Sequence, residues 1–352
     1  MAKKITIAVD AMGGDQAPQM VIDGIADARR LFPHTKFHIY GDETQIQPLL
    51  SAYPELSAAS EVFHTDSVVS SDDKPSQALR RGRQSSMGLA IQAVKDGSAE
   101  VAISAGNTGA LMALAKFMLR TMPGIDRPAL ISPMPTIRGE SVMLDLGANV
   151  ECDSNNLVQF AIMGAAYVRT VLGLSKPTVA LLNVGVEDLK GKDSIKAAAD
   201  VLRDFDHLPL NFVGFVEGND ITTGAVDVVV TDGFTGNVAL KTVEGTARLM
   251  ADLLGRAFRS TLFTKIGYFF ASQGLKSLRD HMDPNNHNGG VFLGLNGLVM
   301  KSHGSANAHG FSSAVTSAID MAQNDLVKLI GEDLQEIAIG DEIVPLAKGD
   351  DS

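Results

Sequence analysis

Two stretches of this sequence share one pattern: an apolar run, then glycine, threonine and glycine, then helical spacing. Val226–Val230 is rich in β-branched residues, which suits a strand buried on both faces, and Gly233–Gly236 follows it. Glu100–Gly109 repeats this arrangement position for position, and Leu298–Lys301 also leads through glycine into helical spacing. Free N–H groups and the positive end of a helix dipole at such turns bind anions. Three loops of one kind therefore predict one anion-binding cleft.

Apolar runs of strand length alternate with helical patterns along the chain. This alternation predicts a three-layer α/β/α sandwich with a mainly parallel sheet, whose ligands bind at the carboxyl ends of the strands. The expected strands are Lys3–Val9, Phe37–Tyr40, the start of Val101–Gly109, Ala129–Ser132, Val142–Leu146, Thr178–Asn183, Phe212–Phe215, Val226–Val230 and Leu298–Lys301. Thr65–Ser76 is expected to be a plain surface loop, with a mobile lid as the alternative.

No linker-like composition divides the chain, so residues 1–338 are expected to form a single domain and 339–352 a short acidic tail. A net charge of −11 argues against nucleic-acid binding, and a single cysteine, Cys152, fits a reducing cytoplasm. No secretory signal or bilayer-spanning apolar run is visible. We therefore expect a cytoplasmic protein.

Several chemical motifs have weak support. The sequence lacks G-x-G-x-x-G, and Gly185–Asp193 has the wrong spacing and chemistry for a nucleotide P-loop. Cys152 lacks a neighbouring histidine that would activate it as a nucleophile. The late histidines do not show the spacing of a helical zinc site; they are His281, His287, His303 and His309. We expect no cofactor and no metal.

Three polar residues near strand ends are candidates for the site, and two of them have an alternative interpretation. Lys190 is either an anion ligand or a solvated lysine. Asp232 is either catalytic or an N-cap of the following helix. His303 is expected to donate a hydrogen bond in a polar cleft, because it lies in the third glycine loop.

Six ordered motifs give the sequence a specific resemblance. They are Asp10–Asp15, Ser104–Gly109, Asp145–Asn149, Asn183–Gly191, Thr231–Asn237 and Lys301–Ser305. The set resembles the bacterial phosphate acyltransferases, which make acyl phosphate from acyl-acyl-carrier protein (acyl-ACP) and inorganic phosphate, over roughly residues 3–335. The resemblance implies a fold like that of isocitrate and isopropylmalate dehydrogenases, a homodimer, and an early role in phospholipid synthesis at the membrane.

The resemblance also implies the site. Catalytic roles fall to Lys190, Asp232, Asn237 and His303. Binding of phosphate and acyl-ACP falls to Asp10, Gly13, Gly14, Asn107, Thr108, Gly109, Asn149, Asn183, Gly233, Thr235, Gly236 and Ser305. Phosphate is already an anionic nucleophile and a thiolate leaves readily, so we expect direct attack on the thioester without an acyl-enzyme.

Two further surfaces are expected. Arg80, Arg81 and Arg83 are one candidate for docking the acidic carrier protein, and the basic residues beyond Gly255 are another. Residues 255–282 are expected to form a protruding amphipathic element with breaks near Gly267 and Gly274. Its membrane-contact residues would be Leu262, Phe263, Ile266, Phe269 and Phe270, although a dimer-facing helix fits the pattern equally well. The expected location is the cytoplasmic membrane surface, where a downstream glycerol-3-phosphate acyltransferase is a further candidate partner.

The alternatives for function are a phosphate acetyltransferase acting on acyl-coenzyme A and a non-catalytic anion-binding regulator. Release of thiol from acyl-ACP but not from acetyl-coenzyme A, dependent on phosphate, separates the first from the expected activity. Absence of any turnover would favour the second.

Overall fold

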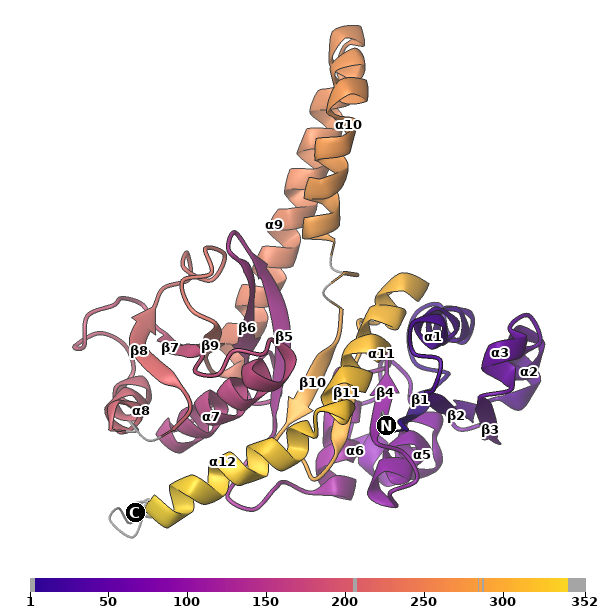
Figure 1. Ribbon diagram of the computed structural model, residues 1–352, viewed down its shortest axis with the longest axis horizontal. Helices are drawn as coiled ribbons and strands as arrows, with labels where there is room; N and C mark the ends of the chain where they lie inside the picture. Colours follow the sequence, from indigo (N-terminus) through magenta and orange to yellow (C-terminus); the bar gives the residue numbers. More distant parts are fainter. Residues whose placement is uncertain (1–3, 205–207, 284, 287, 341–352) are drawn as a thin grey trace.

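Buried strands form one continuous mixed sheet through the molecule (Figure 1). The computed structural model describes residues 4–204, 208–283, 285–286 and 288–340. Within them the strand order is β3-β2-β1-β4-β11-β10-β5-β6-β9-β7-β8. The strands are β1 (Thr6–Asp10), β2 (Lys36–Gly41), β3 (Ser60–His64), β4 (Val101–Ser104), β5 (Ala129–Thr136), β6 (Gly139–Leu144), β7 (Thr178–Leu182), β8 (Asn211–Val216), β9 (Val228–Val230), β10 (Gly290–Leu293) and β11 (Leu298–Lys301).

Helices cover both faces of this sheet and give three layers. They are α1 (Gln19–Leu31), α2 (Glu43–Leu50), α3 (Pro54–Ser57), α4 (Pro75–Arg81), the 3₁₀ turn Gly82–Gln84, α5 (Ser86–Lys95), α6 (Thr108–Leu119), α7 (Ser154–Val171), α8 (Asp193–Arg203), α9 (Gly233–Arg259), α10 (Leu262–Met282), α11 (Ala308–Gln323) and α12 (Leu326–Gly340). One apolar cluster packs α1, α7, α8, α11 and α12 on one face; another packs α4, α5, α6 and the start of α9 on the other. Successive side chains of a strand enter alternate clusters, as Val228, Val229 and Val230 do.

The sheet reverses direction in its middle. β10 pairs antiparallel with β11 and with β5, and β5 pairs antiparallel with β6. The other pairings are parallel. Consequently β6, β7, β8 and β9 run opposite to β1, β2, β3, β4 and β11. The carboxyl ends of the two halves therefore open in opposite directions.

The expected α/β class with a mainly parallel sheet is confirmed, and each expected strand is present, most of them with shifted ends. The short strands β3 and β10 were not expected. β10 begins with Gly290 and offers only Val291, Phe292 and Leu293 as an apolar run, which is too short to distinguish from a loop.

Helices α9 and α10 form a long hairpin that projects from the body (Figure 1). The helical break lies between Arg259 and Leu262, where the Thr261 hydroxyl accepts a hydrogen bond from the backbone N–H of Thr264. The expected breaks at Gly267 and Gly274 are wrong, because both glycines lie inside α10. One glycine inside a helix costs about 1 kcal/mol relative to alanine, which does not by itself end the helix.

No helix in the described part of the chain combines the length and apolar character that a bilayer crossing requires. Two elements of the sequence predictions, His287 and the acidic tail from residue 341 onwards, lie outside the described residues.

Candidate active site

A cavity of about 1330 Å³ opens where the two halves of the sheet meet. Loops after β1, β4 and β11 form one end of it, through Gly13–Asp15, Ala105–Gly109 and Lys301, His303 and Gly304. The length of β5 and the inward face of α9 form the other walls. Three glycine-containing loops thus meet at one cavity. The loops after β4 and β11 were predicted to share one cleft, and they do. The predicted Gly233–Gly236 turn is not part of the lining, and the β1 loop takes its place.

A buried carboxyl group ties the β1 and β4 loops together beneath this end of the cavity. Asp10 Oδ2 accepts a hydrogen bond from Ser104 Oγ at 2.6 Å, and Oδ1 accepts one from the N–H of Met12 at 3.2 Å. Burial raises the pKa of Asp10. A Cβ atom on Gly13 would lie 2.7 Å from both Asp10 Oδ2 and the nitrogen of Gly106, so only glycine fits there. Asp10 therefore supports the loops from below, whereas Gly13 and Gly14 reach the cavity.

Asn107 organises the entrance on the α6 side. Its Oδ1 accepts a hydrogen bond from the N–H of Ala110 at 3.0 Å and caps α6. Its Nδ2 donates to the carbonyls of Ser71 and Asp73 at 2.8 and 3.0 Å. The loop expected at 65–76, whose residues 68–71 line the cavity, is therefore anchored to the helix that also supplies Thr108 and Gly109 to the lining.

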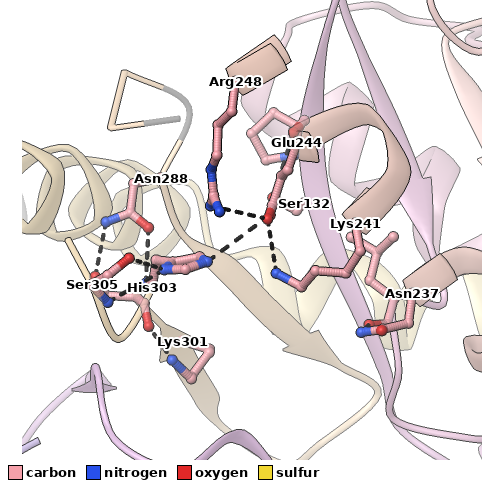
Figure 2. Close-up of polar contacts among 12 residues, drawn as sticks. Ser132, Asn237, Lys241, Glu244, Arg248, Asn288, Lys301, His303 and Ser305 are labelled. Carbon is pink, nitrogen blue, oxygen red and sulfur yellow. Dashed lines mark hydrogen bonds and ion pairs between the residues drawn. The ribbon is translucent and has the colours of Figure 1, made fainter. Parts of the chain in front are cut away.

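A group of charged side chains lies on the inward face of α9 (Figure 2). The Glu244 carboxylate lies 2.9 Å from Lys241 Nζ and 3.7 Å from an Arg248 nitrogen. It also lies 4.0 Å from His303 Nε2, across the cavity on the β11 loop. The Glu244 side chain is only 14 % exposed, whereas the Lys241 and Arg248 side chains are 52 % and 68 % exposed and remain open to solvent. Glu244 thus lies among two cations and one imidazole at the polar end of the cavity.

The surroundings of His303 define which of its nitrogens carries the proton. The backbone N–H of Ser305 donates to His303 Nδ1 at 3.3 Å, and Ser305 Oγ lies 2.9 Å from the same nitrogen. Because a backbone N–H can only donate, we assign Nδ1 as an acceptor and place the proton on Nε2. Burial and the Lys241 charge lower the pKa of His303, which favours the neutral ring. His303 therefore presents an N–H donor towards the cavity, while Ser305 lies behind it.

Lys301 brings a buried cation to the same end. Its Nζ donates to the carbonyl of Ala105 at 3.4 Å and to that of Ser302. Within the described residues no carboxylate lies within ion-pair distance of it, although Asp10 and Asp15 influence it at longer range. Burial and the Lys241 charge lower its pKa to about 8. An anion in the cavity would therefore be attracted strongly.

A second group of expected site residues lies outside this cavity lining. It comprises Asn149, Asn183, Lys190, Asp232, Gly233, Thr235 and Gly236. Most follow β6, β7 and β9, which run opposite to β4 and β11. Asp232 Oδ1 accepts from the N–H of Thr235 at 2.7 Å, and Oδ2 lies 3.2 Å from Lys192 Nζ. Lys190 Nζ lies 3.0 Å from Glu187. Asp232 is thus an N-cap of α9, and the catalytic roles of Lys190 and Asp232 remain predictions.

The buried carboxylate of Asp145 organises part of this second group. Its oxygens accept hydrogen bonds from the N–H groups of Leu130, Gly147, Ala148 and Asn149 and from Asn149 Nδ2. Gly233 donates its N–H to the carbonyl of Asn149 at 2.7 Å. These contacts pack the start of α9 against the loop after β6.

Two amides from the predicted site form hydrogen bonds to backbone carbonyls. Asn183 Nδ2 donates to the carbonyls of Gly185 and Lys190 at 3.1 and 3.0 Å, which shapes the loop after β7. Asn237 lies in the cavity lining and its Nδ2 donates to the carbonyl of Leu146 at 3.1 Å. Of the four predicted catalytic residues, the structure thus brings Asn237 and His303 to the cavity.

Cys152 is half-buried and does not contribute to the cavity lining. Burial and the nearby Asp145 raise the pKa of its thiol to about 12. At neutral pH it is therefore protonated and a poor nucleophile, in agreement with the expected chemistry without an acyl-enzyme.

The polar residues that sequence reasoning missed at the cavity include Lys241, Glu244, Asn288 and Lys301, which line it, and Arg248, which pairs with Glu244 beside it. The i, i+3 and i+7 spacing of Lys241, Glu244 and Arg248 placed them on one helical face, a signal that was available but is common on solvated helices. Lys301 is the first residue of the Lys301–Ser305 motif at a strand end, so its position was a usable signal. Asn288, which accepts from the N–H of His303 at 2.9 Å, carried no signal.

Comparison with known proteins agrees with this architecture. A family model described as "Fatty acid synthesis protein" matches residues 5–329. The chain is 55% identical to the phosphate acyltransferase of Paramagnetospirillum magneticum over 91% of each chain. It is 54% identical to that of Rhodospirillum centenum over 99% of this chain and 98% of the relative.

Solved structures share the fold at low identity. A phosphotransacetylase from Streptococcus pyogenes superposes with a TM-score of 0.58 at 16% identity, over 91% of this chain and 94% of the other. A dehydrogenase of 4-hydroxythreonine 4-phosphate from Salmonella typhimurium gives 0.51 at 12% identity, over 91% and 100%. The expected likeness to dehydrogenase folds is thereby confirmed. Family model and sequence identity together show that the chain is an acyltransferase and belongs to the phosphate acyltransferase family.

Proposed function

We propose that this protein transfers the acyl group of acyl-ACP to inorganic phosphate, giving acyl phosphate and free carrier protein. A phosphate oxygen attacks the thioester carbonyl carbon, a C–O bond forms, the C–S bond breaks, and the thiolate takes up a proton. The observation that carries the proposal is the pairing, in one cavity, of a cationic polar end with an apolar wall. Those two surfaces match the two reactants.

Each residue of the polar end has a proposed task. Lys301, Lys241 and the N-terminus of α6 would hold phosphate, because positive charges and free N–H groups favour anions. The Nε2–H of His303 would donate to the oxygen of the tetrahedral intermediate. Glu244 would act through Lys241 and His303 by fixing their positions. No residue is required as a covalent nucleophile.

Purified protein should release thiol from acyl-ACP only when phosphate is present, with one acyl phosphate formed for each thiol. Free thiol measured by a colorimetric reagent, together with acyl phosphate measured by mass spectrometry, tests this. Turnover of acetyl-coenzyme A in preference to acyl-ACP would favour the phosphate acetyltransferase alternative. Absence of turnover with either substrate would favour an anion-binding regulator and contradict the proposal.

We further propose that the carrier protein docks on a basic surface around α4 and α6. Arg80 and Arg81 are exposed in the last turn of α4, and the Arg83 guanidinium lies 4.4 Å from the ring centroid of Phe117. An adjacent groove is lined by Lys95, Lys116, Phe117 and Arg120, among others, and no acidic residue lines it. The N-terminus of α6 reaches the active-site cavity. A negatively charged partner bound here would therefore lie at the other end of α6, about 15 Å along the helix from the entrance.

Reversing the charge of Arg80 and Arg83 to glutamate should raise the KM for acyl-ACP by about tenfold and leave the KM for phosphate unchanged. The reason is loss of electrostatic attraction at an exposed surface, which salt should also weaken. Steady-state kinetics at two salt concentrations measure both effects. Arg30→Glu with Lys328→Glu, on helices of the opposite face, is the matched control. A changed phosphate KM would place the arginines in the active site instead.

We also propose that the α9–α10 hairpin contacts an anionic membrane surface. Leu262, Phe263, Phe269 and Phe270 are 72–86% exposed. Residues 255–279 carry basic side chains and no acidic one. Basic residues near an anionic surface each contribute about 1 kcal/mol, in addition to insertion of the apolar side chains.

Phe269→Asp combined with Phe270→Asp should abolish binding to vesicles of phosphatidylglycerol and phosphatidylcholine while turnover in solution persists. Vesicle co-sedimentation measures the binding, with Leu31→Asp, an exposed position on α1, as the matched control. Retained binding would place the contact elsewhere. Conversion of a dimer to monomers, measured by light scattering, would instead assign these aromatics to a dimer interface.

A further inference from the structure

One wall of the active-site cavity is apolar over a length that phosphate does not need. Helix α9 contributes Leu240, Val243, Ala247 and Met250, which are spaced by three or four residues and therefore share one face. Strand β5 and its neighbours supply the facing apolar residues Leu130, Pro133, Met134, Pro135, Ile137 and Leu146, and α10 adds Leu278. We call this space the α9–β5 groove.

Polar and apolar lining residues separate on α9. Lys241 and Glu244 turn towards the β11 loop with His303, as Figure 2 shows. Val243 and Ala247 lie on the neighbouring face of the helix, in the groove. A ligand that fits the whole cavity therefore needs an anionic or carbonyl-bearing end joined to a long apolar portion.

The two ends of the groove differ in exposure. Leu130 and Leu146, at the end near the first turns of α9, are 8% and 2% exposed and form a closed floor. Met250 and Leu278, where α9 and α10 leave the body, are 46% and 43% exposed. An apolar chain that lengthens can therefore extend only towards the base of the α9–α10 hairpin.

We infer that the α9–β5 groove binds the acyl chain of the thioester, with the carbonyl beside His303 and the terminal methyl directed towards Met250 and Leu278. This inference rests on the proposed function and adds to it the position of the chain and the residues that select its length. Ala247 lies midway along the wall, and its small side chain leaves room for an acyl chain to pass. A larger side chain at this position would limit the length of chain that fits. Each further methylene that reaches apolar wall should improve kcat/KM by up to about fourfold.

Ala247→Phe tests this placement because it fills the groove beyond the reacting carbonyl. We expect kcat/KM for hexadecanoyl-ACP to fall by at least tenfold, while the value for butanoyl-ACP changes less than threefold. The KM for phosphate should stay at its wild-type value, a readout that a general disturbance of the fold would move. Met250→Trp, closer to the open end, should affect only the longer chains of the series.

Leu249→Phe is the matched control, since Leu249 is 56% exposed and does not contribute to the groove lining. It should leave the whole chain-length profile unchanged. Equal losses at every chain length in both Ala247→Phe and Met250→Trp, or no loss in either, would overturn the inference while acyl-ACP turnover continued. A wild-type protein that turns over no acyl-ACP would instead overturn the proposed function.

Discussion

Replacing Lys301 with methionine should lower kcat/KM for phosphate by about a hundredfold. Lys301 places a buried positive charge at the polar end of the cavity, and a preorganised charge of this kind is commonly worth two to three orders of magnitude. Methionine keeps the apolar stem and removes only the charge, so folding should be preserved. Steady-state kinetics with phosphate as the varied substrate measure the effect, with Lys328→Met on the exposed face of α12 as the control.

The pH dependence of phosphate binding provides the second part of this test. Lys301 has its pKa lowered to about 8, so it is charged below pH 8 and becomes neutral above it. The KM for phosphate should therefore rise as the pH increases through 8. Phosphate also titrates in this pH range, but its titration affects the wild-type and the variant equally and cancels in the ratio of their KM values for phosphate. Lys301→Arg should keep its charge and remove this rise; the same pH profile in all three proteins would exclude Lys301 as the phosphate ligand.

Alanine at Gly236 should destabilise the protein by at least about 3 kcal/mol, whereas alanine at Gly109 should change stability by less than about 1 kcal/mol. Both glycines end the same G-x-T-G motif. A Cβ atom on Gly236 would lie 1.9 Å from the carbonyl oxygen of Asp145, so backbone must move. On Gly109 the nearest atom would be Pro75 Cγ at 3.1 Å, which can shift slightly.

Urea denaturation of the two variants measures the difference directly. The two positions lie in the first turns of α6 and α9, so changes in helix propensity affect both similarly and cancel in the comparison. Equal stability of the two variants would contradict the close approach of α9 to Asp145. Loss of phosphate binding in Gly236→Ala without loss of stability would instead support the original prediction that Gly236 binds substrate.

The class of fold follows from the sequence because buried parallel strands need continuous apolar runs. Val228–Val230 illustrates this: each side chain enters one of the two apolar clusters, which leaves no polar alternation in the sequence. The direction in which each strand runs within the sheet, by contrast, does not follow from local sequence. β10 and β5 reverse the sheet through pairings between residues far apart in the chain, and no local pattern records those partners.

That reversal also explains why the Gly233–Gly236 turn does not line the same cavity as the other two predicted loops. The loops after β4 and β9 carry the same G-x-T-G motif, and local pattern assigned them to one cleft. β9 belongs to the half that runs the other way, so Gly233 and Gly236 pack against Asp145 and Asn149 while Thr108 and Gly109 reach the cavity. Helix α9 then brings Asn237, Lys241 and Glu244 back to the cavity from the side.

The position of β11 has a consequence for biosynthesis. This strand, at Leu298–Lys301, inserts between β4 and β10. One edge of β4, at residues 101–104, therefore pairs only with a strand that is synthesised about two hundred residues later. A chain still on the ribosome therefore presents β4 as an unprotected sheet edge, a site where other nascent chains can pair. Insertion of β11 covers this edge of β4 and places Lys301 and His303 at the cavity in the same step. The risk of aggregation through β4 therefore ends when the anion-binding loop is completed.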